Sequence, residues 1–259
     1  MRLRTTRFVR IQLVVLLAAA APLARASAPE TVAFDTSDGF VLKADLWRST
    51  DAQAPLAILL HQFNRDRTSF APLVPALLER GFTVLAIDQR GQGESLRQKT
   101  AGGDRTLRVQ QVSRSEVGPI VEAGTRDVAA ALAFLERQGI STERLAIVGS
   151  SYGCTVALLA TQTEKRVGAA ALLSPGSSYF GVDVLPAAKA FAGTLFVIAA
   201  QDDPVSSSPG SARAIADAHP GPEELLVFPS GGHGVALFAA HPDLAARIAD
   251  TLAAALARH

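Results

Sequence analysis

The sequence is poor in residues that crosslink a chain or bind metals. Its 259 residues include one cysteine, Cys154. An internal disulfide is therefore excluded, and in an oxidising compartment the fold must depend on its core alone. Metal-ligand clusters and phosphate-binding loops are also lacking, and Gly91 and Gly93 are not followed by the third glycine of a dinucleotide fingerprint. We therefore expect no cofactor and no metal.

The sequence has little net charge, and its small positive balance comes from the N-terminal residues. Residues 1–26 carry five arginines and no acidic residue, and an apolar run at 11–21 precedes the small-x-small sequence Ala24-Arg25-Ala26. This pattern predicts a secretory signal peptide cleaved after Ala26, because the run is too short to span a bilayer. Cleavage lowers the formal charge from +1 to −4, which gives no reason to expect a nucleic-acid partner. We expect a secreted or periplasmic protein without stable membrane insertion after cleavage.

Residues 27–259 predict one α/β domain. The expected strands are 31–34, 40–47, 56–60, 83–87, 145–148, 169–173, 195–199 and 224–228, and the expected helices are 70–80, 127–137, 152–161, 211–218 and 243–257. Continuous apolar strands that alternate with helices predict a mostly parallel, doubly wound sheet with helices on both faces. Residues 96–124 are expected to be a long irregular connection. Residues 175–193 are too few for a large helical lid.

Polar residues with catalytic potential follow the predicted strands, where ligands bind in such sheets. The stretch Gly149-Ser-Ser151-Tyr-Gly153 lies between an apolar strand and an apolar helix and matches G-x-S-x-G. A tight turn is one interpretation. A nucleophile elbow with Ser151 at its tip is the other, and it is favoured because an acid and His233, flanked by three glycines, follow later strands in the order serine, acid, histidine.

The catalytic acid and the oxyanion donors each have two candidates. For the acid they are two aspartates, and for the oxyanion hole they are two backbone N–H groups. Asp202 and Asp203 are adjacent after a predicted strand, and either carboxylate could orient a histidine. The N–H groups of Tyr152 and Phe63 are the expected oxyanion hole, since one follows the nucleophile and the other lies in the loop after an earlier strand. His61, in that loop, is expected to be structural.

Six segments between Leu56 and His233 carry a resemblance to a known family. They are LLHQF, AIDQRGQGES, TRDVAAALAFL, VGSSYG, VIAAQDDPVS and GGHG. With them the chain resembles the α/β-hydrolase superfamily, close to the serine esterase and dienelactone hydrolase-like branch. The resemblance implies an α/β-hydrolase fold with a small lid or none, and a catalytic triad.

The resemblance also bears on single residues. In this family the acid usually lies two residues before a valine, which favours Asp203 over Asp202. Dienelactone hydrolases use a cysteine nucleophile, whereas this chain has Ser151, so a lactone substrate is not implied. The DQRGQGES loop is structural in the family, so Asp88 and Arg90 are not assigned catalytic roles.

Together these features predict a serine hydrolase that cleaves carboxylic esters of small soluble molecules through an acyl-enzyme. Ser151, Asp203 and His233 are the predicted triad, and Tyr179 and Phe180 are expected to line the substrate pocket. A peptidase or an acyltransferase with the same triad remains open, as does a non-catalytic binding protein on a hydrolase fold. The expected partner is a small-molecule ester, and the expected state is a monomer or a weak homodimer.

Overall fold

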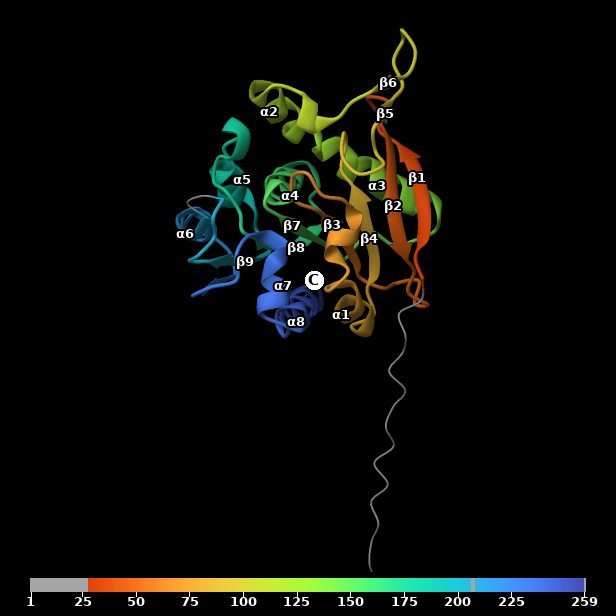
Figure 1. The fold of residues 1–259 in the computed structure, drawn as a ribbon. Helices are drawn as coiled ribbons and strands as arrows, with labels where there is room; N and C mark the ends of the chain where they lie inside the picture. Colours follow the sequence, from red (N-terminus) through yellow and green to blue (C-terminus); the bar gives the residue numbers. More distant parts are fainter. Residues whose placement is uncertain (1–27, 206–207, 259) are drawn as a thin grey trace, which may run out of the picture.

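An eight-stranded, mostly parallel sheet forms the centre of the molecule (Figure 1). The structure, a computed structural model, describes residues 28–205 and 208–258, so the predicted signal peptide lies outside the described residues. The strands are β1 (Glu30–Asp35), β2 (Val41–Trp47), β3 (Leu56–Leu60), β4 (Thr83–Asp88), β7 (Leu145–Ser150), β8 (Val167–Leu173), β9 (Thr194–Ala200) and β10 (Glu223–Phe228). Their order across the sheet is β1-β2-β4-β3-β7-β8-β9-β10. The predicted α/β-hydrolase fold is therefore confirmed.

The antiparallel hairpin and the central parallel strands differ in burial. β1 and β2 form an antiparallel hairpin and alternate buried and more exposed side chains, as expected for strands with one covered face. From β4 to β10 the strands are parallel, and β3, β4 and β7 are buried at every position. Continuous apolar runs thus correspond to strands covered on both faces.

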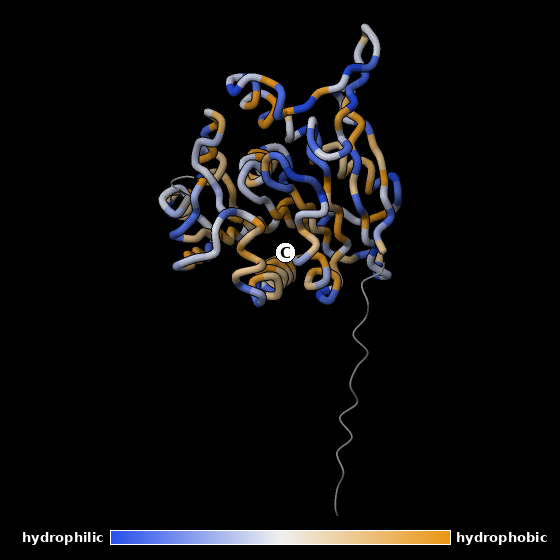
Figure 2. The backbone as a smooth tube through the Cα atoms, viewed as in Figure 1, coloured by the Kyte–Doolittle hydropathy of each residue, from blue (hydrophilic) through white to orange (hydrophobic). Residues whose placement is uncertain are grey.

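Helices cover the two faces of the sheet as separate layers. One face carries α3 (Thr125–Arg137), α4 (Tyr152–Thr163), α5 (Leu185–Ala190) and α6 (Ser208–Ala218), and the other carries α1 (Val74–Glu79), α7 (Leu237–Ala240) and α8 (Leu244–Leu256). Figure 2 shows hydrophobic segments in the centre of the molecule, and buried residues of these helices pack against the strands. Burial of this apolar surface is the main driving force for the fold.

Two expected elements differ from the structure. The helix expected at 70–80 is divided into a 3-10 turn, η1 (Arg67–Phe70), and α1, because Pro72 and Pro75 lack the N–H groups that a continuous helix would need there. The expectation of an irregular connection at 96–124 was wrong. That connection contains the short pair β5 (Arg97–Gln98) and β6 (Arg105–Thr106), the turn η2 (Val109–Gln111) and the ten-residue helix α2 (Arg114–Ala123).

Helix α2 begins with a capping box and packs over the end of α4. The Glu116 carboxylate accepts a hydrogen bond from the Ser113 N–H at 2.9 Å, which stabilises the first turn. Val117 and Val121 are buried although Pro119 lies inside the helix. α2 also contacts the 3-10 turn η3 (Tyr179–Gly181). Within the described residues, no helix has the length and apolarity needed to cross a membrane.

Candidate active site

Ser151 lies at a sharp turn between β7 and α4. Its backbone has φ +50° and ψ −111°, a conformation that a residue with a side chain rarely adopts. The Ser151 N–H donates to the carbonyl oxygen of Leu173 on β8 at 2.8 Å, which holds the turn against the sheet. Backbone strain of this kind needs support from its surroundings and is concentrated at functional sites. The predicted elbow geometry is therefore present at this serine.

Two glycines permit the turn by close approach of backbone to backbone. A Cβ on Gly149 would lie 2.6 Å from the carbonyl group of Gly153. A Cβ on Gly153 would lie 2.0 Å from the carbonyl oxygen of Leu60, at the end of β3. No side chain fits at those distances, so the spacing G-x-S-x-G follows from the packing of α4 against β7 and β3.

The structure brings Asp203 and His233 together. The His233 Nδ1 lies 2.9 and 2.8 Å from the two carboxylate oxygens of Asp203, and the Asp203 side chain is buried. The Val205 N–H also donates to Asp203 at 2.9 Å, which orients the carboxylate. Asp203 follows β9 and His233 follows β10, so two neighbouring strands deliver the pair.

Asp202 points to a different partner. Its carboxylate accepts a hydrogen bond from the Gly232 N–H at 2.9 Å, and the residue is exposed. That hydrogen bond holds the pKa of the Asp202 carboxyl below its ordinary value. Asp202 therefore braces the histidine loop, while Asp203 contacts the imidazole itself.

The histidine loop is hydrogen-bonded to the serine turn through Gln62. The Gln62 Oε1 accepts from the Ser150 hydroxyl at 3.0 Å and from the Val235 N–H at 3.1 Å. The Gly234 N–H donates to the Ser174 hydroxyl at 2.9 Å. Gln62 was not among the predicted site residues. Related motifs have glycine at this position, so the presence of glutamine in this sequence was the signal that could have identified it.

No hydrogen bond joins Ser151 to His233 among the described residues. Catalytic hydrogen bonds of this kind are often long without substrate and shorten when it binds. The pair Asp203–His233 and the elbow serine thus lie on adjacent, mutually braced loops, and the roles assigned to all three stay predictions.

The predicted oxyanion donors are available for a ligand. Within the described part of the chain, neither the Phe63 nor the Tyr152 N–H donates a hydrogen bond. The Tyr152 amide opens the twelve-residue helix α4, and the partial positive charge at a helix N-terminus favours an anion there.

An aromatic cluster stands beside these two amides. The Phe63 ring centroid lies 5.2 Å from that of Phe180 and 5.9 Å from that of Tyr152. Burial raises the pKa of the Tyr152 hydroxyl, which keeps it neutral. Tyr179 turns elsewhere: its hydroxyl donates to the Ser174 carbonyl oxygen at 3.3 Å, and its ring packs on Gly176. Phe180 therefore belongs to an apolar wall near the candidate site, whereas Tyr179 supports the loop after β8.

Other polar residues that the sequence singled out have structural partners. His61 is fully buried, and burial lowers the pKa of its imidazole. Its Nδ1 donates to the Gln62 carbonyl oxygen at 2.8 Å, and its Nε2 accepts from the Gln89 N–H at 3.1 Å. Asp88 accepts from the backbone N–H of Arg67 at 2.7 Å. These contacts assign structural roles to His61 and Asp88, next to the candidate site.

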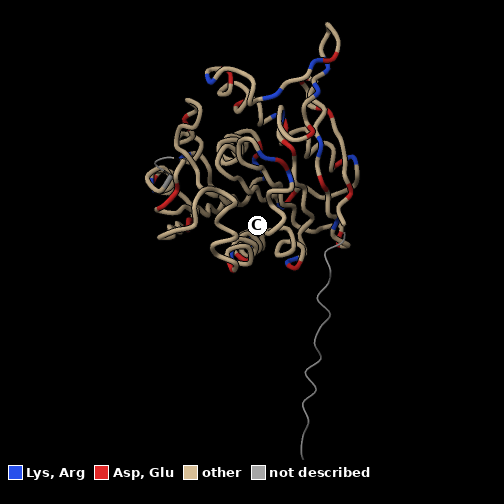
Figure 3. The backbone as a smooth tube through the Cα atoms, in the orientation of Figure 1, with Lys and Arg blue, Asp and Glu red and all other residues tan. Residues whose placement is uncertain are grey.

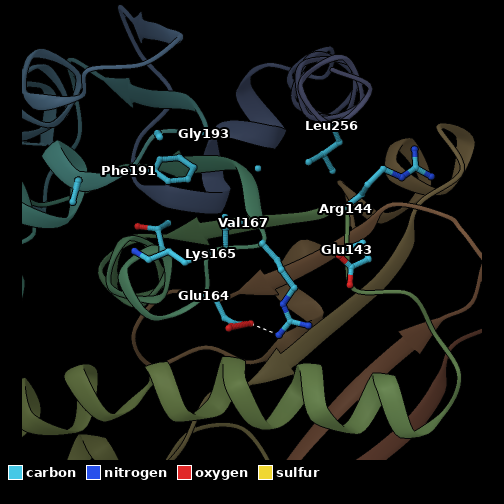
Figure 4. A pocket seen from close by; sticks show the side chains of 13 residues that line it. Glu143, Arg144, Glu164, Lys165, Val167, Phe191, Gly193 and Leu256 are labelled. Atoms are coloured by element: carbon cyan, nitrogen blue, oxygen red, sulfur yellow. Dashed lines mark hydrogen bonds and ion pairs between the residues drawn. The ribbon is translucent and has the colours of Figure 1, made fainter. Parts of the chain in front are cut away.

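Two cavities of similar size lie at opposite ends of the sheet. A cavity of about 370 Å³ lies at the amino ends of β7 and β8, with Arg144, Lys165 and Phe191 among its lining residues (Figure 4). Ligands in parallel sheets bind at the opposite, carboxyl ends. A cavity of about 360 Å³ at that end includes His233 and Gln62. The two cavities have similar volumes, but only the second is lined by a candidate catalytic residue, His233. The second cavity is therefore the one that adjoins the candidate site.

Acidic and basic residues are mixed along the part of the chain that the structure describes. Figure 3 shows acidic and basic residues of the described chain interspersed over the backbone. Among the residues that the structure describes, no group of three or more histidine, cysteine, aspartate or glutamate side chains could hold a metal ion. The site as described offers a serine, a histidine–carboxylate pair and backbone donors.

The chain matches one protein-family model, and parts of it are similar in sequence to two known proteins. Residues 55–195 match the family model described as the alpha/beta hydrolase fold. Epoxide hydrolase B of Mycobacterium tuberculosis is 35% identical over 74 residues, which cover 29% of this chain and 20% of that protein. A polyketide transferase of Aspergillus fumigatus is 29% identical over 154 residues, or 58% of this chain and 46% of that protein. The chain thus aligns with less than half the length of either protein.

Similarity in three dimensions is more extensive. The structure of an esterase from Pyrococcus furiosus superimposes with a TM-score of 0.68 at 19% identity, covering 96% of this chain and 99% of the other. At that identity the superposition establishes the shared fold alone.

Proposed function

Since the chain belongs to the α/β-hydrolase family, we propose that it is a serine hydrolase that cleaves carboxylic esters of small soluble molecules. One observation carries the proposal: His233, joined to Asp203 at 2.8 Å, lies on a loop braced against the strained turn that presents Ser151. A serine hydroxyl is a poor nucleophile at neutral pH and needs such an oriented base. The esterase from Pyrococcus furiosus, similar in fold, agrees with this choice of reaction.

In the proposed first step the Ser151 Oγ attacks the ester carbonyl carbon while its proton passes to the His233 Nε2. The Nδ1–H of the same ring donates to Asp203, which fixes the tautomer and stabilises the imidazolium. The carbonyl oxygen becomes an oxyanion and accepts from the N–H groups of Phe63 and Tyr152. Fixed donors of this kind stabilise the transition state more than the substrate, and each contributes about 3 kcal/mol.

In the second half of the reaction His233 returns its proton to the leaving alcohol, and the acyl group stays on Ser151. A water molecule then loses a proton to His233 and attacks the acyl carbon, which releases the acid and restores the serine. The apolar wall that includes Phe180 would lie beside the acyl group. No cofactor enters the scheme, because both half-reactions need acid–base and nucleophilic chemistry alone.

Acyl transfer to an acceptor other than water is the second candidate. The supporting observation is the partial likeness to a protein named polyketide transferase. The two activities share the acyl-enzyme and differ in which nucleophile reaches it. Hydrolysis of p-nitrophenyl acetate in the presence of rising concentrations of a small alcohol separates them: a transferase forms the new ester in preference to acetate, and a hydrolase forms acetate.

A fluorophosphonate probe tests the nucleophile directly. We expect the probe to label Ser151 and the variant Ser151→Ala to remain unlabelled and to lose about 10⁶-fold in kcat. Ser150→Ala is the matched control, because Ser150 is the neighbouring serine and its hydroxyl donates to Gln62. It should retain labelling and most of the activity, because the Val235 N–H still donates to Gln62 in this variant. Equal loss in the two variants contradicts the assignment, and absence of labelling in the unmodified protein favours a non-catalytic binding protein.

A further inference from the structure

Most of the side chains that line the cavity beside His233 are polar or charged, and Val235 and Ala236 add an apolar part. The cavity occupies about 360 Å³, within the range of small-molecule sites. The residues that line it come from the segment after β3 and from the turn after β10, and they are Gln62, Arg65, Asp66, Thr68, Ser69, His233, Val235 and Ala236. Six of these eight side chains are polar or charged. None of the rings of the aromatic wall is among them, so the two sides of the site differ in chemistry.

The position of this cavity relates it to one part of the substrate. In the proposed mechanism His233 gives its proton to the oxygen of the leaving alcohol, so that oxygen must lie against the imidazole. His233 is itself part of the cavity wall. The carbonyl oxygen is held at the same time by the Phe63 amide, next in sequence to Gln62. The alcohol therefore extends toward the polar cavity, and the acyl group extends toward the aromatic wall.

The amide of Gln62 presents a donor. The Val235 N–H can only donate, so the Gln62 atom that faces it must be the oxygen. The Ser150 hydroxyl donates to the same oxygen. The Gln62 NH₂ group has no hydrogen-bond partner among the residues that the structure describes, and it is thus available to a ligand in the cavity.

The remaining residues that line the cavity include both hydrogen-bond donors and hydrogen-bond acceptors. Arg65 is exposed and forms no ion pair within the described chain, and the Ser69 hydroxyl is likewise without a hydrogen bond there. A hydrogen bond from the Thr68 hydroxyl holds the pKa of Asp66 below its ordinary value, so this carboxylate is charged at neutral pH. Arg65 and Asp66, which are adjacent in the sequence, carry opposite charges, and both line the cavity. The cavity thus favours a neutral group that both donates and accepts.

We propose that this cavity binds the alcohol part of the ester and that the alcohol is a polyol, such as a glycerol or sugar group. The inference rests on the proposed esterase activity and specifies its substrate class: a compact acyl group joined to a hydroxyl-rich alcohol. Hydroxyl groups are the neutral groups that both donate and accept hydrogen bonds, and each can meet the Gln62 amide, the Ser69 hydroxyl or the Asp66 carboxylate. An alkyl alcohol of the same size would desolvate these groups without replacing their hydrogen bonds with water.

The test compares esters that share one acyl group. Glycerol monoacetate and pentyl acetate carry alcohols of equal heavy-atom number, and we expect kcat/KM to be at least about tenfold higher for glycerol monoacetate, the effect of one satisfied hydrogen bond. Methyl 6-O-acetylglucoside distinguishes the two sources of the polyol, since the better substrate of the two identifies a glycerol-sized or a sugar-sized occupant. A kcat/KM for pentyl acetate equal to or above both polyol esters overturns the proposal.

Variants connect the preference to the cavity. Ser69→Ala and Arg65→Ala should each lower the ratio of kcat/KM for glycerol monoacetate over pentyl acetate by about three- to tenfold. Arg137→Ala is the matched control, because Arg137 is also an exposed arginine, at the end of α3, and does not line the cavity. It should leave the ratio unchanged. Thermal unfolding midpoints verify that each variant is folded, and an unchanged ratio in both cavity variants overturns the assignment of this cavity.

The outcome also separates this inference from the proposed function. If both acetates are hydrolysed at similar rates and Ser151 is labelled by the fluorophosphonate, the esterase activity stands and the polyol preference is wrong. If neither acetate is hydrolysed and Ser151 is not labelled, the proposed function fails, and the inference that rests on it fails too.

Discussion

The substitution Gly234→Ala tests whether the contact between the histidine loop and the serine turn matters for catalysis. Gly234 follows His233 and has φ +61°, which disfavours any side chain. A Cβ at this position would lie 2.3 Å from the Gln62 Oε1 and 2.5 Å from the Ser150 Oγ. Ordinary contacts begin at 3.4 Å, so the loop or these side chains must move by about 1 Å.

Movement of the loop and movement of the side chains should each lower the catalytic activity. If the loop moves, His233 shifts relative to Ser151, and a displacement of about 1 Å costs about 10²-fold in rate. If the Gln62 side chain moves instead, its hydrogen bonds with Ser150 and the Val235 N–H are lost, and the loop is held less firmly against the serine turn. We therefore expect kcat/KM for p-nitrophenyl acetate to fall by about 10²-fold in Gly234→Ala.

Gly232→Ala is the control for backbone strain. Gly232 precedes His233 and has φ +70°, so alanine there carries the same left-handed cost of about 1–2 kcal/mol. Its Cβ would meet only the Ala236 Cβ, at 3.8 Å, an ordinary contact. Both variants should therefore lower the unfolding midpoint by about 2–8 °C, while Gly232→Ala keeps activity within a few-fold of the unmodified protein. Equal activity in the two variants would refute the proposed contact as the cause.

Further predictions concern the carboxylates and the cover of the site. Asp203→Asn should lower kcat by about 10⁴-fold and Asp202→Asn by less than tenfold, and steady-state kinetics with the reverse ranking would transfer the role to Asp202. Asp127→Asn removes a partner of the buried Arg90 and should lower the free energy of unfolding by about 3–5 kcal/mol in urea titrations, whereas a loss under 1 kcal/mol would contradict it. Partial burial opposes ionisation of Asp38, but hydrogen bonds from Arg90 and Thr36 outweigh it and hold its pKa below 3.8. The stability that comes from this depressed pKa is complete above about pH 4 and is lost as the pH falls below that value. The unfolding midpoint should therefore fall more steeply below pH 4 in the unmodified protein than in Asp38→Asn. Parallel curves of unfolding midpoint against pH would disprove the linkage. Finally, α5 has six residues, too few for a large lid, so the rate on a sparingly soluble short-chain triglyceride should follow a smooth hyperbola, and a jump when droplets form would be inconsistent with an open site.

Much of the architecture was predictable from local patterns. The strands β3, β4, β7, β8 and β9 lie within two residues of their expected bounds, because each is a continuous apolar run between turn residues. The position of Ser151 between β7 and α4 was also predictable. Gly149 closely approaches the backbone of Gly153 and Cys154, a contact between near neighbours in the chain that the glycine spacing records. The close approach of Gly153 to Leu60 is long-range, and only the folded structure shows it.

Helix α2 shows where local signals conflicted. The segment was expected to be part of an irregular connection, and Pro119 and Gly118 are both unfavourable inside a helix. The capping box of Ser113 and Glu116 favoured one and could have been recognised. Packing against α4 and η3 decides the outcome, because buried Val117 and Val121 offset the weak intrinsic preference.

The sequence by itself determined the order of the elements, the parallel sheet and the location of the elbow, since periodicity and glycine spacing are properties of neighbouring residues. Only the tertiary structure decided which carboxylate meets His233 and what Gln62 does. Asp202 and Asp203 are adjacent and chemically identical, and they differ in the direction of their side chains toward a loop thirty residues away. Gln62 joins Ser150 and Val235, which lie 88 and 173 residues further along the chain. Such contacts arise when the sheet brings distant strand ends to one edge. The valine two residues after Asp203 favoured that residue by family resemblance, but the local chemistry of the two aspartates does not distinguish them.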